Sequence, residues 1–251
     1  MAMGRTALVT GASRGIGRAI AERLAREGTR VVVSARNTEQ LTSLVEALPG
    51  EGHRAVPMDV GDPDSIAKGL AAIGAVDVLV PNAGIAASAP FHRTDDAMWE
   101  EALRVNVTGV FRLCRALVPA MVKARWGRVV IVASNAGLTG YAYTSAYCAS
   151  KHAVIGMMRS IALEIAESGV TMNAVCPGWV DTDMATRAID RIAKKTGKPA
   201  SEARATLEAM SPQRRMVQAD EVASLVAFLC GDEARGIHGQ ALAIDGGQVM
   251  K

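Results

Sequence analysis

Short β-branched runs alternate with longer amphipathic runs along the chain, and this alternation restricts the fold more than any other feature. Strands separated by helix-length segments imply parallel βαβ units with right-handed crossovers. The runs Val31–Val33 and Val129–Val132 are continuously apolar, which is typical of a sheet covered on both faces. We expect strands at Thr6–Thr10, Arg30–Ala35, Ala55–Met58, Val76–Val80, Arg128–Ser134, Thr171–Cys176 and Ala241–Ile244, and helices at about 15–28, 37–48, 63–72, 95–124, 146–168 and 218–230. The pattern predicts one doubly wound α/β domain over residues 1–251, with seven parallel strands and helices on both faces.

The stretch from Met184 to Gln218 breaks the alternation, because it is helix-compatible but polar. Its eight basic residues outnumber its three acidic residues, which leaves a charge of +5: Arg187, Arg191, Lys194, Lys195, Lys198, Arg204, Arg214 and Arg215 against Asp190, Glu202 and Glu208. An excursion between the sixth and seventh strands lies at the edge where ligands bind, and we expect a lid there. The alternative is a solvated surface excursion without function.

Composition excludes several classes of protein. A hydrophobic fraction of 49% argues against disorder, and no apolar run approaches the ~18 residues that span a membrane. The beginning of the chain lacks a secretory signal pattern, and the four cysteines lie far apart with no metal-ligand spacing. We therefore expect a cytoplasmic protein with no metal site. A net charge of +3 is too small to indicate nucleic-acid binding.

A glycine-rich segment, with Gly11, Gly15 and Gly17, directly follows the first expected strand and opens the first helix. Glycines permit a tight turn and the close approach of a diphosphate. The diphosphate then meets free backbone N–H groups and the positive end of the helix dipole. At the first strand–helix junction of an α/β chain, this segment predicts nucleotide binding. Ordinary turns also contain glycine, so the motif alone is weak.

The second expected strand ends at Ala35 and Arg36, with no acidic residue before Glu39. Folds that bind NAD place an Asp or Glu here to hold the ribose 2′-hydroxyl. An anionic 2′-phosphate would instead meet Arg36, and also Arg14 from the glycine-rich segment. The sequence therefore favours NADP(H) over NAD(H); the alternative for Arg36 is a solvated residue at the start of a helix.

Tyr147 and Lys151 are four residues apart on an expected helix, so their side chains share one face. A free tyrosine has a pKa near ~10, and a nearby ammonium favours the phenolate and lowers this pKa. The preceding strand ends at Ser134, at the carboxyl edge where ligands bind. These three residues are candidates for proton transfer.

The ordered motifs resemble the short-chain dehydrogenase/reductase family almost from end to end. They are Thr10-Gly11-x-x-x-Gly15-x-Gly17, Asp59-Val60, Asn82-Ala83-Gly84, Asn106, Ser134, Tyr147-x-x-x-Lys151 and Pro177-Gly178. The resemblance implies a Rossmann-type fold, a homotetramer with pairing of the helices near 102–124 and 146–168, and hydride transfer between NADP(H) and a carbonyl or secondary alcohol. Pro81 departs from the Asn common at that position and lacks an N–H for the sheet.

The resemblance also implies roles for individual residues. Tyr147 would be the general acid or base, and Lys151 would lower its pKa and hold the nicotinamide ribose. Ser134 would bind the substrate oxygen, and Asn106 would support a proton-relaying water. The residues implied in cofactor binding are Gly11, Ser13, Arg14, Gly15, Ile16, Gly17, Arg36, Asp59, Val60, Asn82, Ala83, Gly84, Tyr147, Lys151, Pro177, Gly178, Val180 and Thr182.

The segments 171–178 and 244–247 are most similar to 3-oxoacyl-thioester reductases and polyketide ketoreductases. We expect an acyl thioester of acyl carrier protein or coenzyme A as substrate, recruited by the basic excursion. The alternatives are a dehydrogenase of a small cyclic or secondary alcohol and a catalytically silent nucleotide sensor. Trp179, Met184 and Tyr141 are candidates to line the substrate pocket.

Overall fold

The computed structural model describes residues 4–250. Met1–Met3, where no secretory signal pattern is expected, and Lys251 lie outside the described residues. Its core is one parallel sheet of seven strands in the order β3-β2-β1-β4-β5-β6-β7. The strands are β1 (Thr6–Thr10), β2 (Arg30–Ser34), β3 (Arg54–Ala55), β4 (Val78–Val80), β5 (Gly127–Val132), β6 (Val170–Pro177) and β7 (Ala241–Ile244). The helices are α1 (Gly15–Arg26), α2 (Thr38–Ala47), α3 (Pro63–Ile73), α4 (Asp96–Leu103), α5 (Gly109–Lys123), α6 (Ser145–Ile165), α7 (Asp183–Thr196), α8 (Ala200–Glu208) and α9 (Ala219–Cys230). The doubly wound fold is confirmed.

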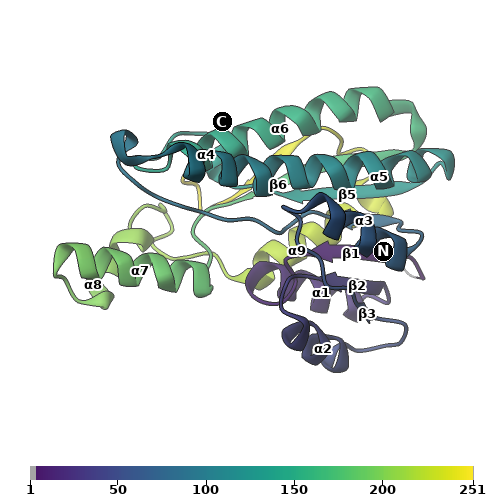
Figure 1. Cartoon of the computed structure of the whole chain (residues 1–251), viewed down its shortest axis with the longest axis horizontal. Coiled ribbons are helices and arrows are strands. Elements are labelled where there is room, and N and C mark those ends of the chain that lie inside the picture. Colours follow the sequence, from purple (N-terminus) through teal and green to yellow (C-terminus); the bar gives the residue numbers. More distant parts are fainter. Residues whose placement is uncertain (1–3, 251) are drawn as a thin grey trace.

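Successive residues of each strand are buried on opposite faces of the sheet. Val31 and Val33 of β2 pack with α1, α2 and α9, whereas Val32 packs with α3, α5 and α6. Figure 1 shows α1, α2 and α9 on one side of the sheet and α4, α5 and α6 on the other. The continuously apolar strands therefore have a simple cause, because the core lies on both faces of the sheet.

Several helices begin where the sequence provides a cap. The side chain of Asn37 accepts a hydrogen bond from Gln40 N at the start of α2, and Asp62 accepts one from Asp64 N at the start of α3. Asp95 does the same for Met98 N at the start of α4. These acceptors satisfy N–H groups that have no partner within the helix, and they fix where each crossover begins.

Two expectations about element bounds need correction. The third strand is Arg54–Ala55 and not Ala55–Met58, because Met58 N reaches only the carbonyl of Ala35, beyond the end of β2. The helix expected over residues 95–124 is interrupted by a π-helical turn at Arg104–Thr108. Such turns are rare and occur frequently at functional sites. The other elements agree with expectation to within about two residues at most ends.

The stretch Asp96–Lys123 is long and apolar enough to cross a membrane by length and composition alone. Half of its most apolar window is buried inside the fold, and the core helix of a soluble protein passes the same test. Arg112 and Arg115 interrupt the stretch, so it contains no uninterrupted apolar run of that length.

The excursion after β6 forms α7 and α8, which project from one side of the molecule (Figure 1). They pack on each other through a small cluster of Ala185, Ile189, Ala203, Leu207 and Met216. The chain leaves and rejoins the body at one place, because Val180 and Val217 form a parallel bridge. We call this bridge the neck of the excursion.

Candidate active site

The glycine-rich segment packs against the residues that follow β4. Asn82 Nδ2 donates hydrogen bonds to the carbonyls of Thr10 (2.9 Å) and Gly11 (3.2 Å), and the hydroxyl of Thr10 accepts from the backbone N–H groups of Asn82 and Ala83. Gly11 has φ +65°, and a Cβ on Gly17 would lie 2.4 Å from the Gly11 carbonyl oxygen. A larger residue at either position would break this contact.

The hydrogen bonds between β1 and the residues after β4 show how the structure accommodates Pro81. Its carbonyl accepts from Val132 N (3.0 Å), and the next two N–H groups are held by Thr10. The missing N–H of the proline therefore leaves Asn82 and Ala83 firmly placed.

The other cofactor candidates lie around this junction. Ser13, Gly15 and Ile16 belong to the glycine-rich segment, and a Cβ on Gly15 would lie 3.3 Å from Thr182 Cγ2, so Thr182 approaches the start of α1. Asp59 and Val60 follow β3, and the Asp59 carboxylate accepts from Gly61 N (2.8 Å). Because free N–H groups, a helix N-terminus and glycines meet here, the junction fits a dinucleotide diphosphate.

The two candidate partners of a 2′-phosphate differ in their surroundings. Arg36 is exposed between β2 and α2, and it forms no ion pair with any described residue. Arg14 lies 3.7 Å from the carboxylate of Asp183 at the start of α7, and both side chains are more than half exposed. Arg14 therefore lies between the glycine-rich segment, to which it belongs, and the start of the excursion.

The family motif also includes residues that serve packing. A Cβ on Gly178 would lie 2.8 Å from Asp245 Cβ, so Gly178 permits close approach of the loop after β7. Pro177 pairs with Ile244 at the end of β6. Val180 is buried in the core cluster on the α1 side, which also contains Ala12 of the glycine-rich segment.

Tyr147, Lys151 and Ser134 meet at the carboxyl end of β5. Ser134 follows β5, and its hydroxyl accepts from Ala136 N (3.1 Å) and interacts with the hydroxyl of Tyr147. Lys151, one turn beyond Tyr147 on α6, donates from Nζ to the Val132 carbonyl (3.1 Å). Its Nζ lies 5.7 Å from the centre of the Tyr147 ring. The helical spacing thus brings the expected pair together.

Burial dominates the electrostatics of this cluster. It raises the pKa of the Tyr147 hydroxyl, and hydrogen bonding to Ser134 only partly opposes this. It also lowers the pKa of Lys151 from 10.5 to about 8. We expected the pKa of Tyr147 to be lowered; in the structure it is raised, because removal of the hydroxyl from water is the largest effect.

Asn106 lies in the π-helical turn and is 1% exposed. Its Oδ1 accepts from Ile85 N (2.9 Å), and its Nδ2 donates to the Ile85 carbonyl (3.0 Å) and to Ser150 Oγ (3.0 Å). A Cβ placed on Gly84 would lie 3.2 Å from Asn106 Oδ1 and 3.7 Å from Lys151 Nζ. Asn106 and Lys151 therefore face the same small space beside Gly84.

Sequence reasoning missed three side chains around this cluster. Ser150, which is fully buried, bonds to Asn106. The thiols of Cys148 and Cys176 lie close enough to Tyr147 to influence its pKa. Ser150 and Cys148 each adjoin an identified residue in the sequence, but only the packed helix shows which way they point.

The candidates for the substrate pocket have different environments. Trp179 packs against the cluster between α7 and α8, whereas Met184 is 44% exposed. The hydroxyl of Tyr141 is buried with no hydrogen-bond partner among the described residues, and burial with nearby Asp245 raises its pKa to about 12. Within residues 4–250, no group of three or more His, Cys, Asp or Glu is placed to hold a metal ion.

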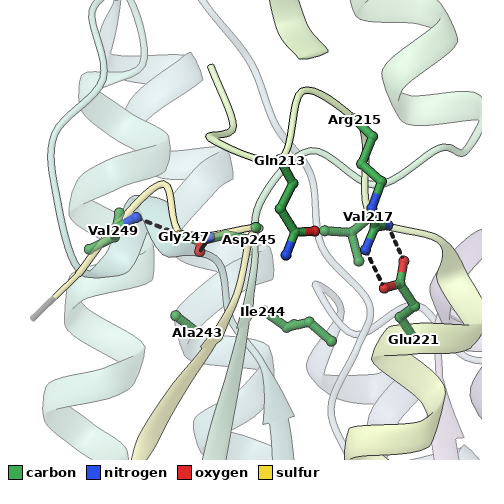
Figure 2. Close-up of a pocket in the computed structure, with 10 residues that line it drawn as sticks. Gln213, Arg215, Val217, Glu221, Ala243, Ile244, Asp245, Gly247 and Val249 are labelled. Carbon is green, nitrogen blue, oxygen red and sulfur yellow. Dashed lines mark hydrogen bonds and ion pairs between the residues drawn. The ribbon is translucent and has the colours of Figure 1, made fainter. Parts of the chain in front are cut away.

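A hollow of about 300 Å³ lies between the end of the excursion and the end of β7. Figure 2 shows Gln213 and Arg215 on one side and Asp245 and Val249 on the other, with Arg215 paired to Glu221. None of Asn106, Ser134, Tyr147 or Lys151 lines it. Asn106, Ser134 and Lys151 are buried and Tyr147 is half-buried, and these candidates for proton transfer lie outside the lining of the hollow.

The charge of the excursion is largely balanced by acids just outside it. Arg204 bonds to Asp181 (2.6 Å), and Arg215 bonds to Glu221 (2.6 Å). From Asp181 to Glu221 the chain carries eight basic residues and seven acidic residues. Arg187, Lys194, Lys195 and Arg214 form no ion pair with any described residue. The charge of +5 therefore overstates the field that this segment presents.

Comparison with known proteins gives consistent matches. A family model described as short chain dehydrogenase matches residues 5–193. The 3-oxoacyl-[acyl-carrier-protein] reductase FabG of Salmonella typhimurium is 40% identical, with 98% of each chain covered. The granaticin polyketide synthase putative ketoacyl reductase 1 of Streptomyces violaceoruber is 38% identical, over 96% of this chain and 92% of its own. The crystal structure of a single-residue variant of actinorhodin polyketide ketoreductase with NADPH superposes with a TM-score of 0.91, at 38% identity and 97% coverage of each chain.

The buried ammonium of Lys151 makes a testable contribution to stability. Because its pKa is lowered to about 8 in the folded protein, the unfolded chain binds more protons between pH 8 and 10.5, and stability rises with pH in that window. A pKa lowered by this amount corresponds to about 3 kcal/mol, at about 1.4 kcal/mol per pKa unit. Loss of the hydrogen bond to the Val132 carbonyl costs ~1 kcal/mol and must be subtracted from this gain. Lys151→Met should therefore stabilise the protein at pH 7 by about 1–2 kcal/mol.

Urea unfolding from pH 6.5 to 9.5 measures this gain, which should shrink above pH 8. The exposed Lys68 of α3, substituted to Met, is the matched control and should show no such trend. A Lys151→Met variant that is destabilised equally at every pH would show that the pKa of Lys151 is not lowered in the folded protein.

Proposed function

The chain belongs to the short-chain dehydrogenase/reductase family, and it is an oxidoreductase of alcohol and keto groups; on this premise we propose that it uses NADP(H) to reduce the ketone of a 3-oxoacyl thioester. The observation that carries the proposal is the meeting of Tyr147, Ser134 and Lys151 next to the junction of β1 and β4. The names of the relatives support the substrate: one is a 3-oxoacyl reductase and another is a putative ketoacyl reductase.

We assign the proton-transfer chemistry to four residues. When bound, the nicotinamide supplies a hydride to the carbonyl carbon or accepts one from the alcohol. The Ser134 hydroxyl hydrogen-bonds the substrate oxygen, and Tyr147 gives that oxygen a proton during reduction. The ordinary pKa of a tyrosine is near ~10 and burial raises that of Tyr147 further, so the side chain starts in the protonated form that reduction needs. The Lys151 ammonium then stabilises the phenolate, and Asn106 supports the path by which the proton returns.

We also propose the cofactor-binding residues that the family motif implies. The N–H groups of the glycine-rich segment would hold the diphosphate, and Asp59, Val60 and Asn82–Gly84 would surround the adenosine. Arg36, with Arg14, would bind the 2′-phosphate. Lys151 would hold the nicotinamide ribose, and Thr182 would lie near the nicotinamide amide.

The residues 184–218 are proposed to act as a lid over the substrate within a single domain. Among the contacts that join the excursion and its flank to the body are the ion pair of Arg14 with Asp183, just before the excursion, and the hydrogen bond from Arg191 to Ser88 (2.7 Å). The second contact reaches the segment between β4 and α4, which also contains Ile85, the partner of Asn106.

A homotetramer in the cytoplasm remains our proposal for the assembled protein. Phe111 on α5 is 42% exposed and Leu163 on α6 is 81% exposed, and these helices are the ones expected to pair between subunits. A catalytically silent nucleotide sensor is disfavoured, because the residues of the proposed mechanism are present and meet in the fold.

The role of Tyr147 predicts a selective loss of turnover. Tyr147→Phe should fold and bind NADPH normally, because the ring keeps its shape, whereas kcat should fall by about 10²–10⁴-fold. Lys151→Ala should lose activity and also bind NADPH more weakly, since two functions are assigned to it. NADPH oxidation and NADPH fluorescence measure the two effects. A kcat of Tyr147→Phe within a few-fold of the wild-type value would contradict the proposed mechanism.

Cofactor preference tests the assignment of Arg36. A charged hydrogen bond contributes about 1.5–3 kcal/mol, or roughly 10- to 150-fold in affinity, so NADPH should be preferred over NADH. The double change Ala35→Asp with Arg36→Ala should reverse the preference, because it supplies an acceptor for the ribose and removes the partner of the phosphate. The kcat/KM values for both cofactors decide the matter, and equal use by the wild type would refute the assignment.

Salt dependence tests the thioester against the small neutral alcohol or ketone. Free cationic groups on α7 should attract an anionic thioester, and salt weakens this attraction over ~8–10 Å. Because nearby acids balance most of the charge, we expect a modest fall in kcat/KM for a 3-oxoacyl thioester of coenzyme A as salt rises. A neutral cyclic ketone should show a flat curve.

Charge reversal provides the control for this experiment. Reversal of Lys194, Lys195 and Lys198 to Glu should reproduce the loss at low salt for the thioester alone. The matched control reverses the exposed Lys68 of α3 and Lys123 of α5, outside the excursion. Overlapping curves for both substrates would favour the alternative, a dehydrogenase of a small cyclic or secondary alcohol.

A further inference from the structure

A fully buried serine on α6 joins two residues of the proposed mechanism. Ser150 is 0% exposed and precedes Lys151 in the sequence. Its Oγ donates to the Tyr147 carbonyl at 2.7 Å. Because a hydroxyl has a single proton, the oxygen that faces Asn106 can only accept, and it receives a hydrogen bond from Asn106 Nδ2 at 3.0 Å. The direction of every proton in this chain of bonds is therefore fixed.

The amide of Asn106 is held at both ends. The backbone of Ile85 bonds to Oδ1 and to one hydrogen of Nδ2, and Ser150 takes the other hydrogen of Nδ2. The Ile85 contacts tie Asn106 to the segment after β4, and the Ser150 contact ties it to α6. Asn106 itself lies in the π-helical turn, whose backbone lacks regular α-helical hydrogen bonds.

The position of this amide matters because of what it faces. The space beside Gly84 lies between Asn106 Oδ1 and Lys151 Nζ. Tyr147, Ser150 and Lys151 all belong to α6, so a bond from Ser150 to Asn106 sets the distance between the turn and the helix that carries the proton donor.

We propose that Ser150 is a positioning residue, which holds the Asn106 amide at a fixed place against Tyr147 and Lys151 on α6. The inference rests on the proposed function, because it gives Asn106 a part in returning the proton. Ser150 touches neither substrate nor cofactor in this assignment, and it acts through Asn106. Without its oxygen, one hydrogen of a buried amide has no acceptor, and the turn can shift relative to α6.

The test compares Ser150→Ala, Asn106→Ala and the double variant. One hydrogen bond of this kind contributes about 0.5–1.5 kcal/mol, so Ser150→Ala should lower kcat by up to about 10-fold and leave the KM for NADPH nearly unchanged. Because Ser150 acts through Asn106, the double variant should be no slower than Asn106→Ala alone. The apparent pKa in the kcat profile should move in the same direction in both single variants.

Two further variants separate positioning from stability. Ser160→Ala changes an exposed serine on the same helix and should leave kcat and its pH profile unchanged. Ser150→Cys keeps the volume but offers a poor acceptor, so it should fold and show part of the same loss. Thermal unfolding of each variant, with assays well below its Tm, shows that a fall in kcat is not a loss of folded protein.

Several results would overturn the inference. Ser150→Ala with a lower Tm but a wild-type kcat and pH profile would show a structural role only. The same conclusion follows if both Ser150 variants fail to fold, or if the two single effects multiply in the double variant. If the wild type reduces no ketone, or Tyr147→Phe retains full turnover, the proposed function fails and this inference with it. An active wild type with an inactive Tyr147→Phe and an unaffected Ser150→Ala removes the positioning role alone.

Discussion

The amide of Asn82 holds the carboxyl ends of β1 and β4 together, and the rest of the site depends on this contact. It bonds to the carbonyls of Thr10 and Gly11, while the Thr10 hydroxyl accepts from two backbone N–H groups on the β4 side. At this point of the sheet the chain order reverses, so neighbouring crossovers leave toward opposite faces and a crevice opens between them. Gly17 has no Cβ to fill the contact, and α1 therefore begins with its N–H groups directed at the crevice.

Desolvation acts in opposite directions on the pKa values of the two titratable groups of the proposed catalytic cluster. The same removal from water raises the pKa of Tyr147 and lowers that of Lys151, so the neutral form of each group is favoured. At neutral pH the tyrosine keeps its proton, while a lysine with a pKa of about 8 is still mainly charged. An acid with its proton beside a cation that stabilises the conjugate base suits proton donation to a developing alkoxide.

The sequence allowed the sheet, its winding and the meeting of Tyr147 with Lys151 to be predicted, because each rests on local periodicity or on fixed spacing. Thr6–Thr10 and Ala241–Ile244 were placed correctly, since apolar runs between turn residues mark buried strands clearly. The short β3 was misplaced, because its bounds depend on where β2 ends beside it. The π-helical turn has no local signature.

The pKa of Tyr147 was misjudged, because a neighbouring charge can be found by spacing whereas the degree of burial cannot. The charge of the excursion was overestimated for a similar reason, because Arg204 and Arg215 pair with Asp181 and Glu221, which lie outside the segment.

The neck between Val180 and Val217 has a consequence for how such a protein can change over evolutionary time. Because the chain enters and leaves the excursion at two paired residues that run in the same direction, α7 and α8 form a side excursion on the connection between β6 and α9. Their own small apolar cluster lets them pack largely on each other. Insertions, deletions or wholesale exchange of these helices would leave the register of β6 and the start of α9 intact, at a small cost in loop-closure entropy. The excursion can therefore be exchanged between related chains while the sheet and the helices that flank it keep their arrangement.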